Sequence, residues 1–561
     1  MPIPPAPNPI GNPIRQLLVL QSVPHRWPFA LRAALCVAVP VLVGWAVGDV
    51  AAGLLATIGG FTALYGSGRP YLNRAVHLAV IAVCLGLSVA LGNWAAEVPW
   101  AGVLTVSAIA VAAVLLCNAL LVGPPGAYMF VLACAAGIGA AHEHVAPWRI
   151  GLLVLAGGAF AWLVHMSGAL IRFRGPEKSA VVSAAESVAG FIEAVGSSAE
   201  VSARHRAAVA LHQSWSVLIN FQPLIPAPSS TLRQLRAANH RLHVVFAEAM
   251  TAAEDNRPLP AGQAQRARGL GTLAGCTVSV DGDRAGDDMP LGRPGPLQLL
   301  REAIRPGSTT LPVVARVGIA VPVAGFIASA LGVDHAYWAM SAAVLILHQG
   351  LDWLRTLQRG IQRLLGTWAG LVLAAVILGL HPQGLWLVLT VAVLQFTIEM
   401  FVVRNYALAV VFITPAALTI ASGGLVVGDV GDLLLARGLD TLIGFVVAVA
   451  VYLPTARRGN PARLAEAIAR TLDAVAATSR HLALGEVTTV GARAARRDLQ
   501  VRALAMRSTY EAAVAGAARG RRSAECKWPA VAATEELAYR TLAGCWVVQR
   551  ATGADTARGV G

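Results

Sequence analysis

The chain has 561 residues, of which 56% are hydrophobic and only 13% are charged. This composition excludes a wholly water-soluble protein and is typical of a polytopic membrane protein with some soluble mass. The net charge of +14 does not indicate nucleic-acid binding, because most basic residues lie beside apolar segments and no aromatic residues interleave with them.

Two groups of apolar segments flank a polar middle region. A helix that crosses a bilayer needs about 20 apolar residues, and this criterion predicts six spans in each half of the chain. The predicted fold is therefore all-α. The predicted spans are 30–48, 50–66, 75–93, 100–117, 119–141 and 150–171 in the first half, and 312–332, 335–350, 364–381, 384–403, 405–422 and 434–453 in the second.

The polar segments complete a five-part organisation. Amphipathic patterns predict three helices after each group of spans, and we expect both sets to form one cytoplasmic helical bundle. Residues 277–296 are rich in Gly, Pro and Asp and are predicted to be a linker. The predicted parts are a Pro-rich cytoplasmic N-terminus (1–29), a first transmembrane repeat (30–171), a cytoplasmic helical region with linker (172–310), a second transmembrane repeat (311–453) and a cytoplasmic helical C-terminal region (454–561).

Basic residues are unevenly shared between the two sets of loops. One set is rich in arginine, as at Arg355, Arg359 and Arg363, whereas the other carries acidic residues such as Glu143 and Asp334. Loops rich in Arg and Lys stay in the cytoplasm. The pattern therefore predicts a multi-pass protein of the inner (plasma) membrane with both termini and the middle region in the cytoplasm.

The two halves match each other as an internal repeat. Six spans per half means that both halves enter the membrane from the same side, so the repeats are predicted to be parallel and related by a pseudo-two-fold axis along the membrane normal. The matched positions include the AVP triplets at 38–40 and 320–322, the turn glycines Gly48 and Gly332, Arg74 with Arg359, and Arg149 with Arg437.

The most distinctive motif lies at the start of the ninth predicted span. Arg359 is followed by the run R-x-x-G-T-x-x-G, formed by Arg363, Gly366, Thr367 and Gly370. With the later runs RNY (404–406), TP (414–415) and RGLDTLIG (437–444), this segment resembles the fusaric acid resistance protein-like (FUSC) family of integral membrane transporters and aromatic acid exporters. The resemblance is strongest over about 315–453 and implies a transporter fold without specifying the substrate.

The arginines near this motif are candidates for substrate binding. Arg359 and Arg363 lie four residues apart, so they share one face of a helix, and Arg74 is the counterpart of Arg359 in the first half. They could form a cationic vestibule for an organic anion, because the planar guanidinium binds a carboxylate in bidentate fashion. The alternative is that they only set topology and contact lipid head groups. Tyr337 and Trp338 could stack an aromatic substrate or belong to an interfacial aromatic belt.

Two further groups of residues are candidates for a central site. Pro124 and Pro125 interrupt the fifth predicted span, and Pro415, beside Thr414, interrupts the eleventh. Paired interruptions in two repeats point either to a central site or to plain kinks. The candidates for proton coupling are Glu399, Asp440 and His348, although a local pair between Arg437 and Asp440 is the simpler interpretation of that carboxylate. Gly366 and Gly370 have the small-xxx-small spacing that lets helices approach closely.

The motifs do not point to an enzyme. The two lysines, Lys178 and Lys527, do not fall in a phosphate-binding loop, so ATP hydrolysis by this chain is not expected. The seven cysteines lack metal-site spacing, and the motif at 142–144 (HEH) is typical of a polar loop, so no cofactor or metal is expected.

The first hypothesis is a secondary transporter that exports small organic acids, aromatic ones among them, driven by the proton gradient. The alternatives are an organic-anion channel on the same scaffold and a non-transporting membrane protein with a regulatory or scaffolding bundle. The expected partners are a small organic anion, the lipid bilayer, a second copy of the chain in a homodimer and an accessory or periplasmic export protein.

Overall fold

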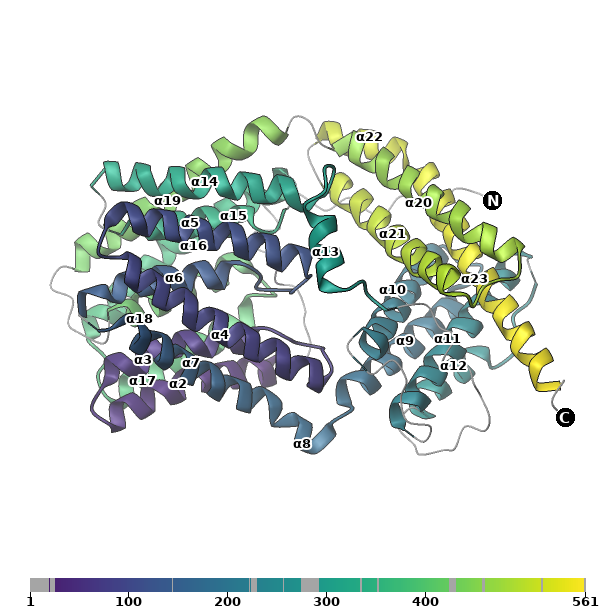
Figure 1. The fold of residues 1–561 in the computed structure, drawn as a ribbon, viewed down its shortest axis with the longest axis horizontal. Coiled ribbons are helices and arrows are strands. Elements are labelled where there is room, and N and C mark those ends of the chain that lie inside the picture. The colour runs from purple at the N-terminus through teal and green to yellow at the C-terminus, as the bar shows by residue number, and fades with distance from the viewer. Residues whose placement is uncertain are drawn as a thin grey trace.

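The computed structural model describes residues 20, 26–143, 145–220, 222, 230–255, 257–273, 292–332, 335–350, 353–422, 430–456, 460–515 and 518–558. All regular secondary structure in these ranges is helical. Spanning helices form one side of the molecule, and a bundle of helices forms the other (Figure 1). Most of the predicted N-terminal part, most of the predicted linker at 277–296 and Asp334 lie outside the described residues.

The membrane domain contains two sets of six apolar helices. By length and composition, seven of the described helices can cross a membrane, and five shorter apolar helices complete the sets. The first set is α2 (Trp27–Ala46), α3 (Val50–Gly60) with the 3-10 turn η1 (Phe61–Leu64), α4 (Tyr71–Ala95), α5 (Pro99–Ala119), α6 (Tyr128–Gly139) with η2 (Ala140–Glu143), and α7 (Pro147–Met166), which leads into α8 (Gly168–Arg172). The second set is α14 (Thr310–Ala330), α15 (Ala336–Leu347), α16 (Trp353–Leu380), α17 (Leu385–Phe401), α18 (Tyr406–Ala421) and α19 (Val430–Ala456).

Two helix starts differ from their predicted positions. The fifth helix begins at Tyr128 rather than at 119, because the consecutive prolines Pro124 and Pro125 cannot continue a helix and stand in the connection before α6. Pro415, in contrast, lies inside α18. The ninth helix begins at Trp353 rather than at 364, so the arginine stripe and the Gly-Thr motif belong to one continuous helix, α16.

The same helix positions contact each other in both halves. In the first half α4 packs on α6 and α7, α3 packs on α2 and α7, and α5 packs on α6; in the second half α16 packs on α18 and α19, α15 on α14 and α19, and α17 on α18. Between the halves, α2 packs on α17 and α14 packs on α5. Two repeats related by a pseudo-two-fold axis along the membrane normal would pack in this reciprocal way. The packing therefore supports the internal repeat, which remains a prediction.

Local sequence explains where several helices begin and end. Asn405, from the RNY run, caps α18 by accepting a hydrogen bond from the backbone N–H of Leu408 at 3.1 Å. Asp49 caps α3 in the same way through the N–H of Ala52 at 2.9 Å. Gly48 and Gly332 have φ angles of 80° and 70° at the ends of α2 and α14, a conformation that glycine adopts without steric cost.

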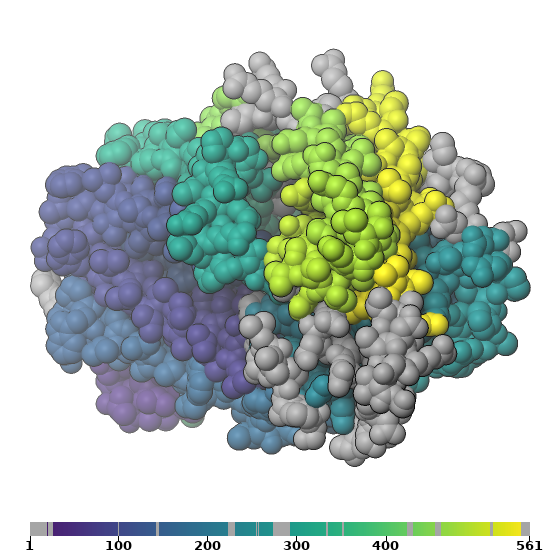
Figure 2. All heavy atoms as spheres, turned by 45° about the vertical axis from the view of Figure 1, so that its right-hand side comes forward, coloured from purple at the N-terminus to yellow at the C-terminus, as the bar shows by residue number. Residues whose placement is uncertain are grey.

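The helical bundle is built from both polar regions of the chain. Its helices are α9 (Gly175–Ala194), α10 (Glu200–Ile219), α11 (Thr231–Glu254), α12 (Gln263–Leu273), α20 (Asn460–Ala483), α21 (Val490–Val514), α22 (Ala518–Cys526) and α23 (Trp528–Arg558). Leu211 and Leu242 of the middle region share one core with Leu499 and Tyr539 of the C-terminal region. The C-terminal helices form the light green and yellow part of the bundle surface in Figure 2. α13 (Pro296–Ala303) lies crosswise to the spanning helices, between the two domains (Figure 1).

A buried carboxylate ties the two parts of the bundle together. Glu535 is fully buried, and its carboxylate lies 3.0 Å from Arg507 Nη1 and 2.9 Å from His205 Nδ1. Burial alone would raise the pKa of Glu535, but the hydrogen bond with His205 and the charge of Arg507 outweigh it and hold the pKa below its ordinary value. Because the folded-state pKa is depressed, this contribution to stability is complete above the ordinary value and is lost as pH falls through the folded-state pKa.

Changing Glu535 to Gln is therefore expected to destabilise the bundle by about 1.5–3 kcal/mol at neutral pH, because Arg507 loses its buried carboxylate partner and keeps only the exposed carboxylate of Glu511. The variant should also lose less stability than the wild type when the pH is lowered to about 4. Thermal unfolding of the full-length protein at both pH values measures this effect. The exposed Glu525→Gln is the control and should behave like the wild type. Equal melting temperatures for Glu535→Gln and the wild type would contradict the assignment.

The predicted orientation can be tested on Cys526, which is exposed at the end of α22 in the bundle. The arginine pattern predicts that the bundle lies in the cytoplasm. In a variant that carries Cys276→Ser, an impermeant thiol reagent is therefore expected to leave Cys526 unlabelled in intact cells and to label it after permeabilisation, and a further Cys526→Ser change should remove the signal. Labelling of Cys526 in intact cells would reverse the orientation. Cys276, for which the same behaviour is expected, lies outside the described residues.

Candidate membrane cavity

A cavity of about 790 Å³ lies between the two halves of the membrane domain. It is lined by α2, α3, η1, α6 and η2 from the first half and by α15, α16, α17, α18 and α19 from the second. This volume falls in the range of roughly 300–1,000 Å³ that is typical of small-molecule sites. The cavity could therefore hold a small organic molecule.

The cavity is lined by residues near both ends of the spanning helices. On the bundle side these include Arg26 before α2, Pro125 before α6 and His348 after α15. On the opposite side they include Tyr337 at the start of α15 and Ser422 after α18. The cavity thus extends along most of the depth of the membrane domain.

The short helices of the membrane domain lie beside this cavity. α6 and α15 have 12 residues each, which correspond to about 18 Å and are too short for a hydrocarbon core of about 30 Å. Side chains donate hydrogen bonds to the backbone carbonyls of the connection before α6. The Tyr65 hydroxyl donates to the carbonyl of Gly126 at 2.7 Å, and Arg69 donates to the carbonyls of Leu121 and Val122. Non-helical backbone at membrane depth is tolerated where protein groups or a cavity satisfy it.

Arg359 and Arg363 form a cationic end of the cavity on the bundle side. Both lie on α16 and line the cavity; Arg363 is buried and Arg359 is half-buried. The Cζ atom of Arg359 lies 4.5 Å from the ring centroid of Tyr406, and the Arg363 guanidinium lies close to the phenol groups of Tyr406 and Tyr128. The Nε atoms of both arginines are buried without a hydrogen-bond partner, and neither arginine forms an ion pair with a carboxylate among the described residues. This end of the cavity could therefore bind an anionic group.

A second polar group lies across the cavity, between α2 and α17. Arg26 Nη2 donates to Glu399 Oε2 at 3.0 Å, and Gln395 Nε2 donates to Glu399 Oε1 at 3.3 Å. All three residues line the cavity. Glu399, a predicted proton-coupling residue, is therefore already paired with a cation, and this pair joins the two halves of the protein.

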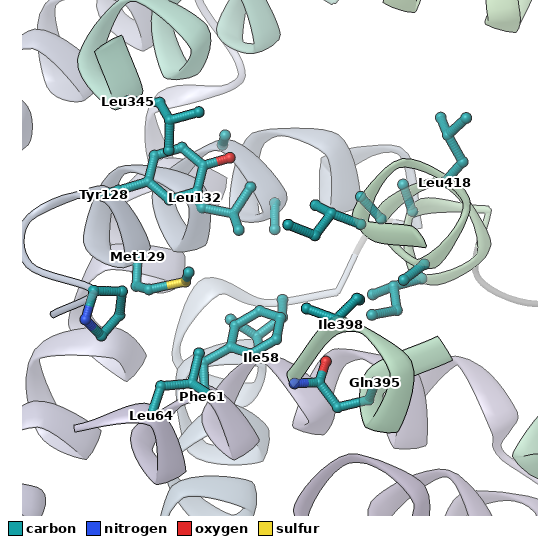
Figure 3. A pocket seen from close by; sticks show the side chains of 18 of the residues that line it. Ile58, Phe61, Leu64, Tyr128, Met129, Leu132, Leu345, Gln395, Ile398 and Leu418 are labelled. Carbon is teal, nitrogen blue, oxygen red and sulfur yellow. The ribbon is translucent and has the colours of Figure 1, made fainter. Parts of the chain in front are cut away.

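Apolar side chains line the middle of the cavity. Ile58, Phe61, Met129, Leu132 and Ile398 surround its interior (Figure 3). They come from η1 and helices of both halves and leave only a few polar atoms among the lining groups. An apolar chamber next to cationic groups suits a molecule that combines a hydrophobic body with an anionic group.

Three more predicted residues line the cavity. His348 is buried beside Gly126, and its Nδ1 atom lies 3.0 Å from the carbonyl of Val344 in the preceding turn. Tyr337 and Trp338 lie at the opposite end, and the Cζ atom of Arg437 lies 3.7 Å from the Trp338 ring centroid. Together with Arg359, Arg363, Glu399, Pro124 and Pro125, these residues are brought to one cavity by the fold.

The structure places three predicted site residues elsewhere. Arg74 donates to the carbonyls of Gly66 and Arg69, each at 3.0 Å, and so holds the connection before α4 rather than a substrate. The Thr414 hydroxyl donates to the carbonyl of Val410 within its own helix. Asp440 is fully buried but does not line the cavity, and neither carboxylate oxygen has a hydrogen-bond partner among the described residues. The expected local pair of Asp440 with Arg437 is not seen, since the Arg437 guanidinium lies against Trp338.

The motif residues have a packing role. The backbones of α16 and α18 come close at Gly366 and Gly370, where an added Cβ would lie 2.6 Å from the carbonyl oxygen of Ala407 and 2.8 Å from the Cβ of Thr414, respectively. Thr367 is fully buried on the same helix. These residues and Pro415 lie outside the cavity lining, and they hold the helix that carries Arg359 and Arg363 in position.

The lining residues that were not singled out in the sequence include Arg26, Tyr128, Gln395 and Tyr406. Arg26 is 373 residues away from its partner Glu399, so no local pattern reveals the pair. Tyr406 belongs to the RNY run, which was used in the sequence for the family resemblance. In the structure Tyr406 lies on α18, which packs on the arginine-bearing helix α16. An aromatic residue close to the motif residue Arg404 was the local signal that could have identified it.

Comparisons with known proteins agree with a membrane protein of this kind. Residues 323–451 match the family described as fusaric acid resistance protein-like. The chain is also 27% identical over 570 aligned positions to the uncharacterized membrane protein YvaC of Bacillus subtilis (strain 168), and the match covers 94% of this chain and 87% of the relative. No solved structure matches the chain. The matched segment contains the cationic end of the cavity and most of the lining from the second half.

Proposed function

We propose that this chain, with its fusaric acid resistance protein-like segment over residues 323–451, exports small organic anions across the cell membrane as a secondary transporter. The observation that carries the proposal is the cavity itself, which combines a cationic end with an apolar chamber and extends along the membrane domain. In this proposal the carboxylate of the substrate contacts Arg359 and Arg363, and its apolar or aromatic body contacts residues such as Met129 and Leu132.

The charges around the cavity support an anionic rather than a cationic substrate. Arg26 and Glu399 neutralise each other, whereas Arg359 and Arg363 retain their positive charge among the described residues. A buried guanidinium without a counter-charge is costly, and a bound carboxylate would reduce that cost. The tyrosine hydroxyls of Tyr128 and Tyr406 add hydrogen-bonding groups at the same end.

The driving force is proposed to be the proton gradient. Of the predicted proton-coupling residues, Glu399 and His348 line the cavity, so either can exchange a proton with a hydrated cavity. An organic-anion channel is the second candidate function, because the cavity is lined by residues near both ends of the membrane domain. The two candidates differ in whether a pH gradient alone can drive accumulation.

Efflux from proteoliposomes tests the proposal. Benzenesulfonate is a suitable probe, because it stays ionised and crosses lipid slowly in the absence of protein. We expect the purified protein to release the trapped anion faster than protein-free liposomes do, and an imposed pH gradient at zero membrane potential to drive net movement against the anion gradient. Release without a response to the pH gradient would indicate a channel. Release no faster than from protein-free liposomes, with benzoate giving the same result, would contradict both candidates.

A further inference from the structure

The two halves of the membrane domain meet along two long helix pairs. We call these the α2–α17 seam and the α5–α14 seam, and each joins a first helix of one half to a fourth helix of the other. If the halves are matched helix by helix in chain order, the two seams occupy equivalent positions. They differ in composition and in their distance from the cavity.

The α5–α14 seam is apolar and closely packed. Val106 and Val114 of α5 and Val317 and Val321 of α14 are fully buried in one continuous core cluster. None of the cavity-lining residues comes from α5 or α14. Opening this seam would expose apolar surface to water at a cost of about 25 cal/mol for each Å².

The α2–α17 seam has two different parts. Away from the bundle, Val37 and Val41 of α2 form an apolar cluster with Leu387 and Val391 of α17. At the bundle end, the contact is instead the ion pair between Arg26 and Glu399, which lines the cavity. The side chain of Arg26 is 21% exposed, whereas that of Glu399 is 5% exposed. The cavity is therefore displaced toward this seam, and a polar contact lies at the bundle end.

We infer that the Arg26–Glu399 ion pair is a gate that closes the cavity on the bundle side, and that the α2–α17 seam opens there while the α5–α14 seam stays closed. Arg26 is partly exposed, so water can replace its bonds to Glu399 when this end opens, and less apolar surface is uncovered than in the valine-packed α5–α14 seam. The role of the gate in export rests on the proposed function, but its effect on access to the cavity does not.

Access to the cavity can be measured with a cysteine at Leu132, an apolar lining residue of α6. The experiment uses full-length protein in which the native cysteines are replaced, in inside-out membrane vesicles, with an impermeant methanethiosulfonate as the probe. Arg26→Gln and Glu399→Gln are each expected to raise the labelling rate of Leu132→Cys about fivefold, which corresponds to about 1 kcal/mol of gate stability. The exchanged pair Arg26→Glu with Glu399→Arg should restore slow labelling.

Arg32→Gln is the matched control. It removes a positive charge from the same helix, but among the described residues Arg32 donates to the carbonyl of Pro28 in its own chain segment, and it does not line the cavity. Labelling should therefore stay at the parent rate. Unchanged labelling in both gate variants, or the same increase in Arg32→Gln, would overturn the gate. Faster labelling in the gate variants of a protein that moves no organic anion would leave the gate standing and refute the proposed function.

A cross-link separates the two seams. Val111 and Gly318 face each other across the α5–α14 seam, where a Cβ on Gly318 would lie 3.4 Å from Val111 Cγ2. A disulfide between Val111→Cys and Gly318→Cys should leave labelling of Leu132→Cys unchanged. A short cleavable bismaleimide between Arg26→Cys and Glu399→Cys should slow the labelling at least fivefold, and cleavage of the linker should restore it. The opposite pattern would assign the opening to the α5–α14 seam.

Discussion

Replacing Arg363 by lysine is expected to reduce organic-anion efflux at least tenfold while the protein reaches the membrane at its normal level. Arg363 lines the cavity from α16, is buried, and lies beside the phenol groups of Tyr128 and Tyr406. Lysine keeps the positive charge but not the planar fork that binds a carboxylate through two parallel hydrogen bonds. The loss of one charge-assisted hydrogen bond costs about 1.5–3 kcal/mol, which is roughly tenfold or more in affinity.

Arg355→Lys is the control for this experiment. Arg355 lies on the same helix but does not line the cavity. Both variants should insert equally well, because the topology rule counts positive charge rather than its shape. Efflux by Arg363→Lys at the wild-type rate, at equal protein level, would show that this arginine sets topology and does not bind the substrate.

The Gly370→Leu variant is expected to lose most of its stable, correctly folded protein. An added Cβ at Gly370 would lie 2.8 Å from both the Cβ of Thr414 and the carbonyl oxygen of Val411, so a leucine would force α16 and α18 apart. Overpacking of a filled interface costs typically 1–3 kcal/mol, and here the displaced helix carries Arg359 and Arg363. The amount of monodisperse protein in detergent and its thermal stability measure the effect.

Gly379 provides a matched control on the same helix. A Cβ there meets no atom within 4 Å, so Gly379→Leu should fold normally and gain slightly from the better helix propensity of leucine. Normal yield, stability and efflux of Gly370→Leu would contradict the close packing of these two helices.

Much of the membrane domain could be predicted from the sequence, because apolar length and arginine position are local signals. Each of the predicted spans has a helix in the structure, and two of the three arginines before the ninth span, Arg359 and Arg363, line one end of the cavity. The helix starts at 128 and 353 were misplaced for physical reasons. The Pro124–Pro125 pair delayed the start of α6, and the arginine stripe extended α16 toward its N-terminus, ahead of its apolar part.

The rest depends on contacts between distant segments. Arg74 matches Arg359 in sequence, but α4 does not line the cavity, because the cavity is displaced toward the α2–α17 seam. The sequence repeat therefore predicted Arg74 as a second cavity residue, but the fold places it outside the cavity. The pairing of Arg26 with Glu399 could not be predicted, because it depends on the contact between α2, the first helix of one half, and α17, the fourth helix of the other.

The central claim is that the cavity binds an organic anion through Arg359 and Arg363. Comparing benzoate with benzamide tests it most directly, since the two molecules share one apolar body and differ in charge. A ligand that binds the folded protein raises its melting temperature according to its concentration and affinity. We expect benzoate to stabilise the purified protein, benzamide to have little effect, and the stabilisation by benzoate to disappear in the double variant Arg359→Gln with Arg363→Gln. Equal stabilisation by both molecules, or stabilisation by benzoate that survives the loss of both arginines, would contradict the claim.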